Sequence, residues 1–172
     1  MAEERTGEVT MKGNPLTLLG PHIDANEDAP DFTALRALTN PFKLSETGGK
    51  VRILLSVPSL DTPVCSLETK RFNQEAEKLG GDVEVYVVSV DTPFAQSRWC
   101  GAEGVSNVTA LSDFKDRDFG TKYGVEIKDL GIYARAAFVL DREGVVVYSE
   151  YVPEVASEPN YEAILGAAAA AA

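Results

Sequence analysis

Metal ligands and cross-linking residues are scarce in this sequence. Its 172 residues include one histidine and two cysteines. The histidine, His22, follows a proline in a turn-rich stretch, where a solvated or locally bonded loop histidine is expected. No Cys-x-x-Cys pair is present, so a four-ligand zinc site has no obvious set of ligands. We therefore expect no bound metal.

Two cysteines, Cys65 and Cys100, are also too few to form a disulfide scaffold. The acidic N-terminus lacks the apolar segment of a secretory signal, and we expect a cytoplasmic location. In that compartment a cysteine pair is more often redox-active, metal-linked or incidental than structural.

Long apolar runs and excess positive charge are absent as well. No run approaches the roughly 20 residues that a membrane-spanning helix needs, so we expect no membrane insertion. The formal net charge of −11 argues against binding to nucleic acid and against a polybasic membrane contact.

What is present is an alternation of strand and helix patterns in a chain of ordinary composition, 44% apolar and 25% charged. The length suits one domain, residues 1–172, and no linker divides it. The predicted order is a hairpin over 8–19, strands at 42–45 and 51–57, a helix at 66–79, a strand at 83–90, a short helix at 94–100, a strand at 108–111, a helix at 116–123, paired strands at 132–140 and 145–151, and a helix at 159–172. This order predicts a three-layer α/β domain with a mixed central sheet.

The most informative stretch runs from Pro58 to Cys65, between a buried strand and a helix. Thr62 is a good helix N-cap and Pro63 suits the first helical position, which places Cys65 in the first turn. Unpaired backbone N–H groups and the helix dipole favour a thiolate there. We therefore expect Cys65 to be a reactive thiolate, although a buried and inert cysteine remains the alternative.

The tripeptide Asp61-Thr62-Pro63 is repeated as Asp91-Thr92-Pro93, again where an apolar strand ends. The second copy predicts a short helix with Cys100 near its C-terminal end, where the dipole disfavours an anion. By this reasoning Cys65 is the activated thiol and Cys100 the ordinary one, and Cys100 can equally be a half-exposed bystander.

Three further residues are candidates for a site around Cys65. The Thr62 hydroxyl can donate to the sulfur or to a bound oxygen, and Pro58 would shape the loop and keep water from the sulfur. Arg135 lies in a small, apolar run and, if buried, must be paired; a thiolate and an oxygen-rich ligand would pair it. The alternative for Arg135 is an edge position from which it reaches solvent.

Taken together, these motifs resemble the peroxiredoxins, and more narrowly the bacterial thiol peroxidase subfamily of atypical two-cysteine peroxiredoxins. Pro58-x-x-x-Thr62-x-x-Cys65 is similar to the peroxiredoxin signature. The resemblance covers nearly the whole chain, except the alanines at 167–172. The other matching pieces are Arg71-Phe72-Asn73, Arg98-Trp99-Cys100, Asn107-Val108, Leu111-Ser112-Asp113-Phe114, Ala134-Arg135-Ala136 and Phe138-Val139-Leu140-Asp141.

The resemblance implies a thioredoxin-like fold with an added N-terminal β-hairpin, and no metal or organic cofactor. It implies that Cys65 is the peroxidatic cysteine, that Cys100 resolves it through an intrachain disulfide, and that Pro58, Thr62 and Arg135 complete the site. Hydrogen peroxide and alkyl or lipid hydroperoxides would be the substrates, thioredoxin the reductant and a homodimer the assembly. The function implied is antioxidant defence and redox homeostasis.

Two other functions stay open at this point. A thioredoxin-type thiol–disulfide oxidoreductase would need the Cys-x-x-Cys pair that the chain lacks. A redox sensor or binding protein of the same fold would use the disulfide only as a switch.

Overall fold

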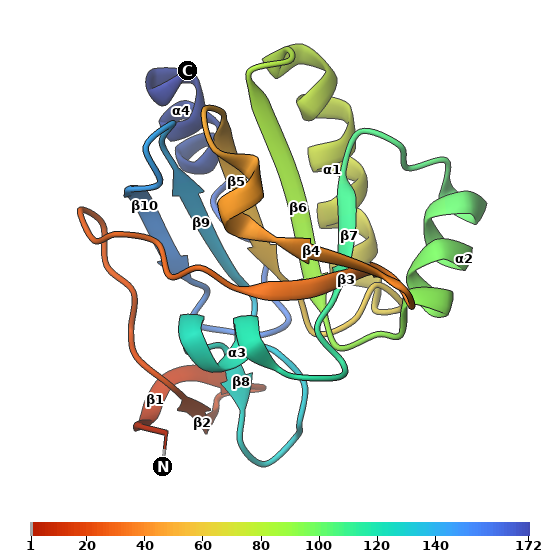
Figure 1. Ribbon diagram of the computed structural model, residues 1–172. Coiled ribbons are helices and arrows are strands. Elements are labelled where there is room, and N and C mark those ends of the chain that lie inside the picture. The colour runs from red at the N-terminus through yellow and green to blue at the C-terminus, as the bar shows by residue number, and fades with distance from the viewer. Residues whose placement is uncertain (1) are drawn as a thin grey trace.

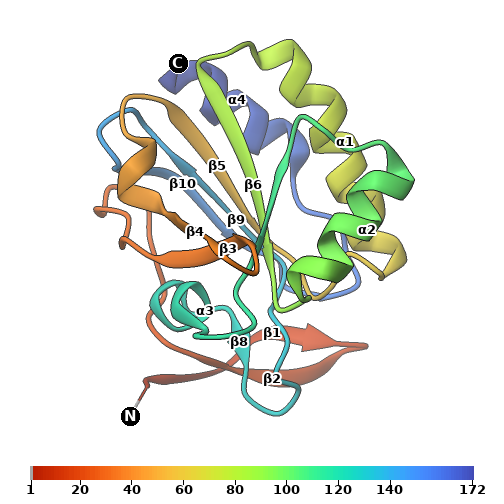
Figure 2. The same cartoon turned by 45° about the vertical axis from the view of Figure 1, so that its right-hand side comes forward.

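The computed structural model describes residues 2–172, and its main feature is a twisted seven-stranded sheet with helices on both faces (Figures 1 and 2). The strand order is β10-β9-β5-β6-β7-β3-β4, in which β5, β6 and β7 run parallel and the other neighbours are antiparallel. A separate sheet has the order β1-β2-β8. This arrangement confirms the predicted α/β class with a mixed sheet and an added N-terminal hairpin.

The strands are β1 Glu4–Met11, β2 Asn14–Leu19, β3 Thr33–Ala37, β4 Asn40–Lys43, β5 Val51–Ser56, β6 Val83–Ser89, β7 Thr109–Ser112, β8 Glu126–Ile127, β9 Ala136–Leu140 and β10 Val146–Tyr151. The helices are the 3-10 turn η1 Leu44–Thr47 and the α-helices α1 Pro63–Leu79, α2 Pro93–Glu103, α3 Asp118–Tyr123 and α4 Tyr161–Ala171.

Alternation along β5 divides the core between the two faces of the sheet. Ile53 and Leu55 pack toward α1, α2 and α4, in a cluster that also contains Cys65. Leu54 points to the other face, where aromatic side chains from α3 and the strands gather. Figure 2 shows α1, α2 and α4 along one face and α3 beside the opposite one. Because both faces are covered, every residue of β5 is buried, including the polar Arg52 and Ser56.

The structure corrects several predicted boundaries. The strand expected at 42–45 ends at Lys43, because Leu44 starts a 3-10 turn and buries its side chain. The strand expected at 132–140 begins only at Ala136, since Ala134 instead donates to the carbonyl of Val125 beside the small sheet. The helix expected at 94–100 runs through Gly101 to Glu103. Strands β3 and β8 were not predicted.

The last helix packs its alanine run against the core. Asn160 caps this helix by accepting from the backbone of Ala163 at 3.1 Å. Ala168 is fully buried and belongs to the cluster on the α1 face. The run at 167–172 therefore contributes to packing, which its composition alone did not indicate.

Candidate active site

Cys65 occupies the first turn of α1, as predicted. Thr62 is the N-cap, Pro63 the first helical residue, and the Thr62 hydroxyl oxygen accepts from the Cys65 amide at 3.4 Å. The thiol is free and its residue is fully buried. The helix start thus holds a sulfur inside the protein, next to backbone N–H groups that have no helical partner.

The Thr62 hydroxyl donates to a different acceptor from the sulfur or bound oxygen that was predicted. It donates to the carbonyl of Ser59 at 3.0 Å, so in this structure its proton does not point to the sulfur. Thr62 therefore fixes the turn that precedes Cys65, and its direct use as a donor to a bound oxygen requires that bond to be exchanged.

Arg135 is 1% exposed, so the alternative of an edge arginine that reaches solvent is wrong. It lies immediately before β9, and its Nε and Nη2 donate to the carbonyl of Val155 at 3.2 and 3.0 Å. Its Nη1 donates to Glu68. Burial would lower the pKa of Arg135, but attraction to Glu68 and to Cys65 outweighs it and raises that pKa. The guanidinium is thus a fixed cation beside the thiol.

Glu68 is the residue of this cluster that the sequence prediction missed. It is fully buried on α1, one turn after Cys65, and its Oε1 has no hydrogen-bond partner within residues 2–172. Desolvation raises the pKa of Glu68 to about 7, against the opposing influence of Arg135. The spacing Cys65, Glu68, Thr69 and Phe72 places these residues on one helix face, and this signal could have identified Glu68 as buried.

An apolar cavity of about 290 Å³ lies over this cluster. Pro58, Thr62 and Arg135 all line it, so the structure brings three of the predicted site residues together. The remaining lining residues are Met11, Lys12, Pro63, Val64, Ile132, Val155 and Ala156. Met11 comes from the N-terminal hairpin, which therefore closes one side of the cavity.

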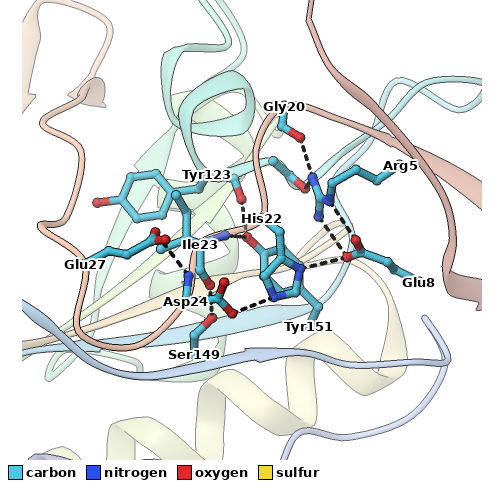
Figure 3. Close-up of polar contacts among 11 residues, drawn as sticks. Arg5, Glu8, Gly20, His22, Ile23, Asp24, Glu27, Tyr123, Ser149 and Tyr151 are labelled. Carbon is cyan, nitrogen blue, oxygen red and sulfur yellow. Dashed lines mark hydrogen bonds and ion pairs between the residues drawn. The ribbon is translucent and has the colours of Figure 1, made fainter.

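The hairpin is held in place by a polar cluster around the buried Arg5 (Figure 3). Arg5 donates to the carbonyls of Gly20 and Gly124 and to the carboxylate of Glu8, which also bonds His22 at 3.0 Å. The hydrogen bond from Arg5 lowers the pKa of Glu8 to about 2. His22 is a locally bonded loop residue, as expected, and the cluster positions the hairpin over the cavity.

Cys65 is not itself among the residues that line the cavity, and Cys100 does not line it either. It lies in the last turn of α2, half-buried and free, and burial raises the pKa of its thiol. Its neighbour Trp99 is buried in the core, in agreement with the simplest prediction for that residue. The two cysteines differ in position as predicted, Cys65 in the first turn of its helix and Cys100 in the last turn of another. That Cys65 is the activated thiol stays a prediction.

Residues 2–172 contain neither a cluster of possible metal ligands nor a helix that could cross a membrane. No three His, Cys, Asp or Glu side chains in this range are grouped as a metal site would require. Within the same range no helix is long and apolar enough to cross a membrane.

A sheet of this order with a cysteine at the first helix start defines a class of thioredoxin-like proteins, and comparison with known proteins identifies the family. The family model described as Redoxin matches residues 24–165. The chain is 51% identical over 163 residues to the thiol peroxidase of Bacillus subtilis (strain 168), covering 95% of this chain and 97% of that one. It is 50% identical over 164 residues to the thiol peroxidase of Clostridium acetobutylicum, covering 95% and 99%.

Solved structures agree. A peroxiredoxin-like protein from Aquifex aeolicus superposes with a TM-score of 0.88 at 42% identity, covering 98% of both chains. The thiol peroxidase from Chromobacterium violaceum shares the fold, with a TM-score of 0.81 at 22% identity over 91% of both chains. The chain belongs to the redoxin family and, within it, to the thiol peroxidase subfamily of the peroxiredoxins. It is a thiol-dependent peroxidase, an oxidoreductase.

Proposed function

We propose that the protein reduces hydroperoxides through Cys65, with Cys100 as the resolving thiol and thioredoxin as the reductant. The observation that carries this proposal is the position of a buried cysteine in a helix's first turn, beside a buried arginine, beneath an apolar cavity. An apolar cavity with few, fixed polar groups is the usual form of a small-molecule site.

In the first step the Cys65 thiolate attacks the terminal peroxide oxygen, along the O–O bond. An S–O bond forms and the O–O bond breaks, and the departing alkoxide takes up a proton as alcohol (or as water from hydrogen peroxide). Arg135 has five donors and uses three on Val155 and Glu68, so two remain for the sulfur and the peroxide oxygens. These donors and the first-turn N–H groups stabilise the charge that develops on the leaving oxygen.

In the second step the Cys65 sulfenic acid condenses with the Cys100 thiol, which forms the disulfide and releases water. A reduced thioredoxin dithiol then exchanges with this disulfide, regenerates both thiols and leaves as its own disulfide. Pro58, which is buried at the cavity, excludes water from the sulfur between these steps.

The second step requires α2 to change conformation. Both helices start from adjacent loops, and Cys100 lies seven residues beyond Pro93, about 10 Å along the axis. Cys65, in contrast, lies at the start of its helix, in the first turn of α1. A disulfide needs Cα atoms roughly 4.4–6.8 Å apart, and we infer that the two cysteines are further apart than this in the reduced protein. We expect the Cys100 end of α2 to unwind during turnover, so oxidised and reduced structures that superpose there would contradict this step.

The cavity also suggests a substrate preference. Its lining is almost entirely apolar apart from Arg135, Thr62 and Lys12, which suits an alkyl or lipid hydroperoxide better than hydrogen peroxide. We expect a lower KM for cumene hydroperoxide than for hydrogen peroxide. We further propose that the protein works in the cytoplasm as a homodimer, which sedimentation analysis of the reduced protein would test.

A coupled assay tests the proposal. Thioredoxin, its reductase and NADPH are mixed with the protein, and cumene hydroperoxide starts the reaction. Cys65→Ser should abolish NADPH consumption, and Cys100→Ser should allow one turnover per chain. NADPH consumption that does not depend on Cys65 would overturn the proposal, and an absence of catalytic turnover in the unaltered protein would favour the switch alternative.

A further inference from the structure

The two copies of the Asp-Thr-Pro tripeptide share the role of their threonine but differ in the contacts of their aspartate. In both copies the threonine caps a helix: Thr62 accepts from the amide of Cys65, and Thr92 accepts from that of Ala95 at 3.3 Å. The two aspartates have different surroundings. Asp61 is exposed and forms an ion pair with Arg98 at 3.4 Å.

Asp91, in contrast, is half-buried and binds the other copy's loop. One carboxylate oxygen accepts from the Ser59 hydroxyl at 2.8 Å. The second oxygen accepts from the Leu60 amide at 2.9 Å and from the Ser89 hydroxyl at 2.7 Å. A single carboxylate from the β6–α2 junction therefore holds the β5–α1 junction.

The bond to Ser59 connects Asp91 to the reactive cysteine in three links. Ser59 is fixed by Asp91 through its hydroxyl, and its carbonyl accepts from both the amide and the hydroxyl of Thr62. Thr62 in turn caps the amide of Cys65. The position of the first turn of α1 thus depends on a residue 26 positions further along the chain.

The same cluster holds the start of α2 but not its end. The Ser89 hydroxyl, which donates to Asp91, also accepts from the Gln96 amide group at 3.0 Å, and Gln96 donates to the carbonyl of Leu111 at 2.9 Å. The Ser112 hydroxyl bonds the Asp91 carbonyl. No side chain of this cluster bonds a residue of α2 beyond Gln96, so Cys100 lies in the part of the helix that these side chains do not hold.

We propose that Asp91 is a positioning residue that joins the two redox segments, holding the Cys65 loop in its reactive geometry and anchoring the first turns of α2 while the Cys100 end unwinds. This inference rests on the proposed function and deepens it. It assigns a hinge to the segment between Gln96 and Cys100, and it gives the second Asp-Thr-Pro copy a role that helix capping alone does not require.

The test compares Asp91→Asn and Ser59→Ala with the matched control Asp61→Asn. Asparagine keeps the shape of Asp91 but replaces one acceptor oxygen by a donor, so the residue can no longer accept both from Ser59 and from Leu60 and Ser89. Ser59→Ala removes one link and leaves the other Asp91 bonds in place. Two rates are measured on the reduced protein well below its melting temperature: alkylation of Cys65 by iodoacetamide in a Cys100→Ser background, and oxidation by cumene hydroperoxide followed by Trp99 fluorescence.

We expect both rates to fall by about 10- to 100-fold in Asp91→Asn, because a displacement of about 1 Å at a reacting atom costs that much. Ser59→Ala should show a smaller fall in the same direction, and Asp61→Asn should stay near the unaltered protein. Rates in Asp91→Asn and Ser59→Ala equal to those of Asp61→Asn would overturn the inference. Should Asp91→Asn fail to fold, Ser59→Ala decides.

Alkylation needs no peroxide, so it separates this inference from the proposed function. If Asp91→Asn and Ser59→Ala show the expected slower alkylation but the unaltered protein shows no peroxide turnover, Asp91 remains a positioning residue and the peroxidase mechanism is refuted. Amide hydrogen exchange on the oxidised protein tests the proposed hinge in α2 separately. We expect amides of 97–104 to lose protection while those of 93–96 keep it, and loss over the whole helix would contradict the hinge.

Discussion

Arg135 is held by two segments that are distant in sequence, Glu68 of α1 and Val155 beyond β10. A buried charge is tolerated only when it is paired and hydrogen-bonded, and this one has both kinds of partner. The rigid fork leaves fewer conformations for the donors that face the cavity, which is the preorganisation that electrostatic catalysis needs. The residue therefore serves packing and chemistry together.

Arg135→Met should lower the rate constant for oxidation of Cys65 by about 100-fold or more, because the donors for the departing oxygen are lost. The variant also leaves Glu68 buried and unpaired, which costs about 3–5 kcal/mol of stability. The double variant Arg135→Met with Glu68→Gln should recover stability but not rate. Stopped-flow fluorescence and urea unfolding measure the two effects, with Arg71→Met, whose guanidinium lies over the Tyr161 ring, as the control. Recovery of the rate in the double variant would refute the role of Arg135.

Residue-scale predictions succeeded where the signal was local. The Thr62 cap, the first-turn cysteine and the different position of Cys100 all follow from neighbours within four residues. The partners of Arg135 do not, because Glu68 is 67 positions away and reads as one of many charges on its helix. The hydrogen bond from the Thr62 hydroxyl to the Ser59 carbonyl could not be predicted from the sequence either, since a hydroxyl proton has several possible acceptors.

At the scale of elements, the hairpin β1–β2 depends on close approach to the end of α3. Gly124 has φ +63°, and a Cβ there would lie 2.0 Å from the carbonyl oxygen of Pro21. Arg5 donates to the Gly124 carbonyl at the same point. The backbone contact that docks the hairpin therefore requires a glycine for space as well as for conformation.

Gly124→Ala should destabilise the protein by about 2–5 kcal/mol, the sum of a left-handed backbone and a steric overlap that something must relieve. Gly131→Ala is the matched control: its φ is +67°, but a Cβ there meets nothing within 4 Å. It should cost only about 1 kcal/mol. Urea unfolding measures both, and equal losses would show that the hairpin does not dock as tightly as the structure indicates.

Elements with strong periodicity were predicted to within a few residues, among them β5, β6 and α1. Strand β8 was not predicted because its two residues form a ladder with the distant β2, and β3 was not predicted because one side of it meets β7 at a single position. Short strands are defined by partners that no local pattern names. The continuation of α2 through Gly101 was missed because the left-handed cap lies at Gly104 instead.

At the scale of the whole molecule, the acidic groups divide into two sets with opposite effects on stability. Desolvation raises the pKa of Glu68 to about 7 and that of Asp113 to about 6. Folding favours their protonated forms, so their contribution is complete below their unfolded pKa values and is lost as the pH rises through 6 to 7. Glu8, with its pKa lowered to about 2, contributes above its unfolded pKa and loses that contribution as the pH falls toward 2.

The free energy of unfolding, measured in urea between pH 5 and 8, should therefore decline with rising pH by up to a few kcal/mol from the first set. Glu68→Gln and Asp113→Asn should each flatten this decline, whereas Glu8→Gln should lower the free energy of unfolding by a constant amount between pH 5 and 8 and leave the slope there unchanged. Slopes that are identical in all four proteins would contradict the burial-driven shifts.

The most direct test of the peroxidase mechanism locates the oxidised atom after a single turnover. Reduced Cys100→Ser protein is mixed with one equivalent of cumene hydroperoxide and trapped with dimedone, and the labelled peptide is identified by mass spectrometry. We expect a dimedone adduct on Cys65, and in the unaltered protein an intrachain disulfide between Cys65 and Cys100. The same labelling of Cys65→Ser protein serves as the comparison. The peroxidase mechanism would be contradicted if no adduct formed on Cys65, or if an adduct formed on Cys100 in Cys65→Ser as fast as one forms on Cys65 in Cys100→Ser.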